Sequence, residues 1–303
     1  MPETEDASVR TVVVAVAANL LTAVAKAVAA VLTGSAAMLA ETTHSIADTC
    51  NEVLLYVGVR HGARPADGHH PFGYGKARYT WSLLAAVGIF VVGGLFAVAD
   101  GVQTLRRPEP VTNVLVGVAV LLVCAGLEGM SWRTARRQLR AEAAARDLHL
   151  GEYLAISSDP TPAAVFLEDS AALIGLALAL VALLLHIMTG SAVWDGAASL
   201  LIGLLLIVVA YLLIRRNAAL LIDEAAPADV RERLRQAVAQ EPWVAEVAEL
   251  IAVYIGPKQL LVLVHVVPVD GTELTASVGR LRRRLLAVPA IAAVEITPVE
   301  RAN

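Results

Sequence analysis

Six apolar blocks, each about as long as a membrane-spanning helix, occupy the first two thirds of the chain. A helical span needs about 20 mostly apolar residues. Short glycine-containing breaks such as Gly34-Ser35 and Gly190-Ser191 separate successive blocks. We expect an all-α polytopic domain whose six transmembrane helices lie near residues 10–33, 37–59, 81–104, 111–132, 163–187 and 194–214.

The pattern changes after residue 217, where charged residues become frequent and short alternating segments replace the apolar blocks. Periodicity predicts helices over 228–240 and 272–286, and strands over 247–254, 259–267 and 290–297. A helix–strand–strand–helix–strand order is typical of a small α+β domain. We therefore predict a transmembrane domain over residues 1–217 and a C-terminal domain over residues 218–303.

Composition agrees with a membrane protein. The chain is 57% hydrophobic and 17% charged, with a mean hydropathy of +0.66, which is too apolar for an ordinary soluble domain. The net charge of −4 gives nucleic-acid binding no electrostatic support. Cys50 and Cys124 form no CxxC pair and are expected to be inert helix residues. The acidic start lacks a basic region, so no cleavable signal peptide is expected.

Lysine and arginine in the loops predict the orientation. Five arginines between Arg133 and Arg146 follow the fourth block, whereas the opposite side carries only Arg106 and Arg107. Because basic residues accumulate on the cytoplasmic side, both termini should be cytoplasmic. We expect a multi-pass protein of the lipid bilayer, in the plasma (inner) membrane of a bacterium.

The second block carries Glu41, His44, Asp48 and Glu52 on one helical face. Each ionisable group at membrane depth costs roughly 2.5–3.5 kcal/mol, so four on one face indicate an ion pathway. His44 and Asp48, four residues apart, can point at one ion. Nitrogen with oxygen suits zinc, manganese, iron or cobalt. The structural alternative is that His44 forms an interhelical hydrogen bond and Asp48 caps a neighbouring helix.

The fifth block adds Glu168 and Asp169. Adjacent helical residues point about 100° apart, so we expect only one to aim squarely at an ion. Asp169 is the predicted ligand, with Glu168 as a fourth ligand or a proton-carrying neighbour. Alternatively, both line an aqueous crevice without binding metal. Asp159, which precedes Pro160, is expected to cap the helix.

Other polar residues are weaker candidates. Asp100, Glu128 and Asp195 lie in or near spans and could serve proton or ion traffic or simply face water. His265 lies in a predicted strand, where a structural role is the commoner one. No Ser/His/Asp arrangement, P-loop or dinucleotide fingerprint occurs, so we expect neither an enzyme nor a cofactor.

Two segments resemble signatures of the cation diffusion facilitator family: ETTHSIADTCN at residues 41–51 and HPFGYGK at residues 70–76. The resemblance implies a divalent metal/proton antiporter that forms homodimers. It also implies a C-terminal ferredoxin-like domain and one transport site per protomer between spans two and five. His44, Asp48 and Asp169 match family ligand positions.

The chain departs from the family pattern at Val165, where a ligand usually stands. This leaves three side-chain ligands, with Glu168 or water as the fourth, and resembles a divergent branch. Asp67 and His70 match a cytoplasmic loop site by spacing, but Tyr74 replaces its later histidine, so only weak binding is expected there. A two-metal site in the C-terminal domain is not expected, because the tail has only His265.

The combined expectation is divalent metal efflux by alternating access, with zinc ranked first, then manganese, and then iron or cobalt. Metal would bind deprotonated Asp48 and Asp169 with neutral His44, and protons would displace it. Glu41 and Glu52 would flank an access path or couple protons. The alternatives are a membrane metal sensor or scaffold that does not transport, favoured by Val165, and a passive channel.

Overall fold

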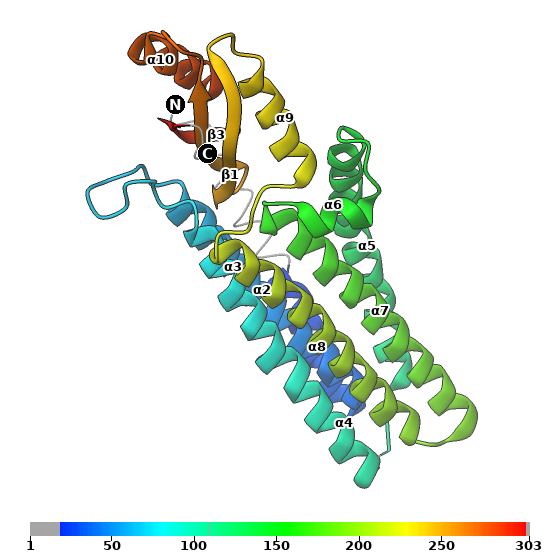
Figure 1. Ribbon diagram of the computed structural model, residues 1–303. Coiled ribbons are helices and arrows are strands. Elements are labelled where there is room, and N and C mark those ends of the chain that lie inside the picture. Colours follow the sequence, from blue (N-terminus) through cyan, green and yellow to red (C-terminus); the bar gives the residue numbers. More distant parts are fainter. Residues whose placement is uncertain (1–18, 109, 301–303) are drawn as a thin grey trace. The chain divides into compact units, whose positions relative to one another are not determined.

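A computed structural model describes residues 19–108 and 110–300 (Figure 1). These residues form two compact units. One contains the described residues up to Gly58 together with Thr80–Asn217, and the other contains Val59–Tyr79 with the residues from Ala218 onward. The loop after the second helix therefore makes its contacts within the C-terminal unit.

The first unit is helical. Its described helices are Asn19–Thr33, α2 (Ala36–Gly62), α3 (Ala77–Gly88), η1 (Ile89–Leu95), α4 (Phe96–Arg106), α5 (Val114–Ala144), α6 (Leu150–Ile156), α7 (Pro160–Thr189) and α8 (Val193–Leu221). The segment η1 is a π-helix, so α3, η1 and α4 form one continuous helix with a wider central turn.

Four of these helices are long and apolar enough to cross a membrane: Ala77–Arg106, α5, α7 and α8. The Asn19–Thr33 helix is shorter, and the first predicted span begins at residue 10, outside the described residues. Although α2 has a comparable length, it carries Glu41, Asp48 and Glu52 and is not one of the four. Length and composition thus identify four of the six expected spans.

Glycines allow the η1–α4 segment to approach α8 closely. A Cβ atom on Gly203 would lie 2.6 Å from the backbone nitrogen of Val98, and one on Gly101 would lie 2.5 Å from that of Leu200. Small residues at such crossings let two helical backbones pack directly in a membrane.

Replacing Gly203 with valine is expected to destabilise the helical unit by about 1–3 kcal/mol, because the neighbouring backbone cannot move aside as a side chain can. Thermal unfolding of the purified protein in detergent measures this loss. The control is Gly126→Val on α5, where a Cβ atom meets nothing within 4 Å. Equal losses in both variants would contradict the close-packing interpretation.

The C-terminal unit contains α9 (Ala228–Ala239), β1 (Val244–Gly256), β2 (Gln259–Pro268), α10 (Leu274–Leu286) and β3 (Ile291–Pro298). The sheet order is β1-β2-β3, with β1 antiparallel and β3 parallel to the central β2. Alternate β2 residues, including Val262 and Val264, are buried with Leu281 of α10. The predicted order of helices and strands is therefore found, with boundaries shifted by three residues or fewer.

The HPFGYGK segment has a structural role within the C-terminal unit. Gly73 has a φ of +78°, a conformation that favours glycine. A Cβ atom on Gly75 would lie 2.7 Å from the carbonyl oxygen of Ile255, so only glycine fits against this strand end. Lys76 forms an ion pair with Asp223 at 2.5 Å.

Candidate metal site in the membrane unit

A cavity of about 290 Å³ lies among four helices of the first unit. Its lining includes five carboxylates, contributed by α2, α5 and α7, and the Asn19–Thr33 helix contributes Asn19 and Thr22. The carboxylates are Asp48, Glu52, Glu128, Glu168 and Asp169. A cavity lined by one sign of charge with low-dielectric walls concentrates counter-ions, here cations.

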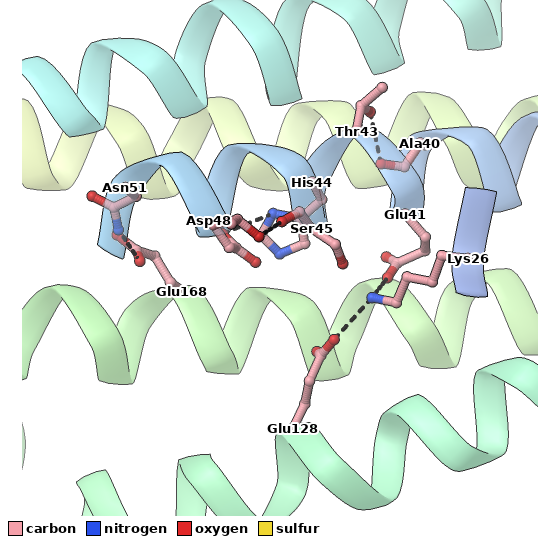
Figure 2. A network of polar contacts seen from close by, with 11 residues as sticks. Lys26, Ala40, Glu41, Thr43, His44, Ser45, Asp48, Asn51, Glu128 and Glu168 are labelled. Atoms are coloured by element: carbon pink, nitrogen blue, oxygen red, sulfur yellow. Dashed lines mark hydrogen bonds and ion pairs between the residues drawn. The ribbon is translucent and has the colours of Figure 1, made fainter. Parts of the chain in front are cut away.

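His44 and Asp48 lie one turn apart on α2, as their spacing predicts. His44 Nδ1 is 3.4 Å from Asp48 Oδ1, and His44 is 1% exposed (Figure 2). Neither ring nitrogen of His44 has a hydrogen-bond partner in the described residues, and neither does Asp48 Oδ1. Buried polar atoms are ordinarily paired, so these are nitrogen and oxygen donors available to a ligand.

Glu168 and Asp169 both line the cavity, although they are adjacent on α7. Asn51 Nδ2 donates a hydrogen bond to Glu168 Oε2, and Ser131 Oγ donates one of 2.7 Å to Asp169 Oδ2. Glu168 Oε1 is buried and unpartnered in the described part of the chain. Val165, at the position where the family usually has a ligand, lines the same cavity.

A buried lysine, which sequence reasoning overlooked, lies next to the cavity. Lys26 Nζ donates to Glu41 Oε2 at 3.0 Å and to Glu128 Oε1 at 2.8 Å, and Figure 2 shows it between the two carboxylates. The side chains of Lys26 and Glu41 are fully buried. Glu41 is therefore paired with a cation, and it does not line the cavity that contains Asp48.

The candidate ligands do not converge on one point. Among the residues that the structure describes, no group of three or more His, Cys, Asp or Glu side chains lies close enough to hold a metal ion. His44 also does not line the cavity, unlike Asp48. Binding by all four candidates would thus require local rearrangement of α2 or α7 side chains.

Two further acidic residues cap helices. Asp195 of α8 is 1% exposed and accepts hydrogen bonds from Ser35 Oγ and the Ala36 backbone nitrogen, each at 2.5 Å, and from Ala37. It caps the start of α2 from another helix. Asp159 caps α7 by accepting from the backbone nitrogen of Thr161, as predicted.

The loop candidate Asp67 is already engaged within its loop. It accepts hydrogen bonds from the Tyr74 hydroxyl and from the backbone nitrogens of His69 and His70. The Tyr74 hydrogen bond, followed by those backbone bonds, lowers the pKa of Asp67 below its ordinary value. On the sheet, His265 Nδ1 is 3.1 Å from Glu249 Oε2, a cross-strand pair.

Replacing Tyr74 with phenylalanine is expected to raise the pKa of Asp67 toward its ordinary value, because the hydroxyl stabilises the charged carboxylate. Because the pKa of Asp67 is lower in the folded protein, the charged carboxylate stabilises the folded loop at pH values above the ordinary pKa of aspartate. This stabilisation is lost as the pH falls through the pKa that Asp67 has in the folded protein. Carbon NMR of labelled aspartate across a pH series measures the change. Tyr211→Phe is the control, and an unchanged Asp67 titration in the Tyr74 variant would contradict the expectation.

Apolar helices long enough to span a bilayer, around a carboxylate-lined cavity, define a membrane protein of the cation-handling class. The family model described as the cation efflux transmembrane domain matches residues 12–222. The chain belongs to the cation diffusion facilitator family. This family consists of transporters, which fits the expectation that the chain is not an enzyme.

Similar proteins from several organisms support this membership. The chain is 33% identical over 268 residues to the proton-coupled zinc antiporter SLC30A9, mitochondrial, of Xenopus laevis, covering 88% of this chain and 48% of that protein. It is 36% identical over 191 residues to metal tolerance protein C4 of Arabidopsis thaliana, covering 63% and 42%. It is 30% identical over 242 residues to the cation-efflux pump FieF of Shewanella oneidensis, covering 78% and 74%. The chain spans about half the length of the first of these relatives.

Proposed function

We propose that the chain is a divalent metal efflux transporter. The cavity carries the proposal, because Asp48 and Asp169 come from different helices and line one cavity beside the donors of His44. Relatives described as a zinc antiporter and a cation-efflux pump support the same function. The proposed ligands are His44, Asp48 and Asp169, with Glu168 as a fourth.

We propose that transport is coupled to protons by alternating access. Metal binding requires deprotonated carboxylates and a neutral imidazole, so protons compete for the same atoms. Metal would enter from the cytoplasm when these groups are deprotonated and leave when protons return on the other side. Glu52, which lines the cavity one turn beyond Asp48, would lie on the access path.

The architecture we propose has six membrane-spanning helices, cytoplasmic termini and a cytoplasmic C-terminal domain of the ferredoxin-like kind. The homodimer that the family resemblance implies is part of the proposal. The membrane is proposed to be the plasma membrane of a bacterium, although the Xenopus laevis relative is named as mitochondrial.

Zinc is the proposed physiological metal, followed by manganese, iron and cobalt. One nitrogen with two or three carboxylate oxygens fits tetrahedral zinc. The same oxygen ligands also suit manganese, because it prefers harder donors than zinc does. Val165 lines the cavity at the position where the family usually has a ligand. Because valine cannot bind a metal ion, its presence weakens the preference for zinc.

A flux assay tests this function. The purified protein is reconstituted into liposomes with an internal metal indicator, and uptake of zinc, manganese, iron and cobalt is compared with and without a proton gradient. We expect zinc uptake to be fastest and to rise when the trapped compartment is acidic. A Val165→His variant, run in parallel, should shift preference further toward zinc.

The assay separates the alternatives. A passive channel would carry metal down its gradient at the same rate without a proton gradient. A sensor or scaffold would bind metal without carrying it across the bilayer. Either result from folded native protein would overturn the proposed antiport.

A further inference from the structure

We propose that Glu128 of α5 is an additional metal-binding residue of the cavity, and that Lys26 is a tethered cation that holds its carboxylate while the site is free of metal. This inference rests on the proposed transport function and extends its ligand set to a third helix. It accounts for a buried lysine that the transport mechanism does not otherwise use.

The lining of the cavity places Glu128 with the proposed ligands. Glu128, Asp48 and Asp169 all line the same cavity. Ser131 lies three residues after Glu128 on α5, therefore on the same helical face, and donates to Asp169 Oδ2 at 2.7 Å. The Glu128 side chain thus belongs to the α5 face that contacts Asp169.

The two oxygens of Glu128 have different environments. Oε1 accepts from Lys26 at 2.8 Å, whereas Oε2 is buried without a hydrogen-bond partner among the described residues. An ammonium group is a compact point charge on a flexible stem, so it can release one carboxylate while it keeps another. Glu41 provides that second partner at 3.0 Å.

Lys26 and an incoming metal therefore compete for Glu128. A divalent cation that binds Asp48 and Asp169 would attract the free Oε2 of Glu128 and draw it from the ammonium. Lys26 would then remain paired with Glu41, which does not line the cavity. The extra carboxylate supplies an oxygen donor where Val165 supplies none.

Glu41 and Glu128 form a matched pair for a test, because both bind Lys26 but only Glu128 lines the cavity. Zinc and manganese binding to the full-length protein in nanodiscs is measured by calorimetry. We expect Glu128→Gln to raise the dissociation constant at least tenfold and Glu41→Gln to change it less than threefold.

The double variant Lys26→Met with Glu41→Gln removes one positive and one negative charge, so the net charge is unchanged. It leaves Glu128 without its tether, and we expect metal to bind at least threefold more tightly than to the native protein. A misfolded variant would bind metal more weakly than the native protein, so tighter binding cannot result from misfolding.

Equal effects of Glu128→Gln and Glu41→Gln would overturn the inference, and so would native or weaker affinity in a double variant whose thermal unfolding shows that it is folded. The proposed function fails in a different way. If the native protein bound no metal, or if His44→Ala bound it as tightly as the native protein, the transport site itself would be wrong.

Discussion

Replacing Asp48 with asparagine is expected to reduce zinc flux in liposomes at least about 100-fold, while the protein keeps its fold. Asparagine has nearly the same shape but carries no charge, so the cavity is preserved and a metal ligand is lost. Loss of a residue that only supports a ligand costs about 10–100-fold in metal affinity, and loss of a ligand costs more. Initial rates of indicator response measure the effect.

The matched control is Glu52→Gln, which changes another α2 carboxylate of the same cavity. We expect a smaller reduction there, below about tenfold, with unchanged metal affinity, because Glu52 is proposed to lie on the path rather than at the site. If both variants lost the same fraction of flux, Asp48 would be one of several equivalent cavity charges.

The second large effect concerns stability. Replacing Asp195 with alanine is expected to lower the free energy of unfolding by about 2–4 kcal/mol, since it removes a helix cap made by a charged group. Ser35 Oγ and the first backbone nitrogens of α2 would then be buried without an acceptor. Thermal unfolding in detergent, followed by intrinsic fluorescence, measures the loss.

Asp100→Ala provides the comparison, because Asp100 is only half-buried and its hydrogen bond from Ser199 is 3.5 Å long. The Asp100→Ala variant is expected to lose less than about 1 kcal/mol of its free energy of unfolding. A stable Asp195 variant would show that α2 begins equally well without this cap.

Much of the fold could be predicted because its signals are repeated many times along the chain. Four apolar blocks of about 20 residues are found as helices long and apolar enough to cross a membrane, and the apolar run over 259–267 predicted the strand that is β2. The π-helical segment Ile89–Leu95 has no comparable signal, because its residues are those of any apolar helix.

The site was harder to predict, for physical reasons that particular residues illustrate. The 100° step between Glu168 and Asp169 predicts that only one aims squarely at an ion, and the structure adds that both line the same cavity. The contact between Asn51 and Glu168 joins positions 117 residues apart, and no local pattern encodes it.

Lys26 could have been found from the sequence. It is the single lysine of the first apolar block, and an ionisable residue at membrane depth requires a partner. Its two partners, Glu41 and Glu128, lie 15 and 102 residues away, and only the folded helices show that one ammonium binds both.

The separation of these partners along the chain has a consequence for biosynthesis. Glu128 lies 102 residues after Lys26, so the ribosome delivers the lysine long before its second carboxylate. Glu41, only 15 residues away, arrives first and gives the emerging helical hairpin a neutral pair. Lys26 therefore has both of its carboxylate partners only after α5 has been synthesised.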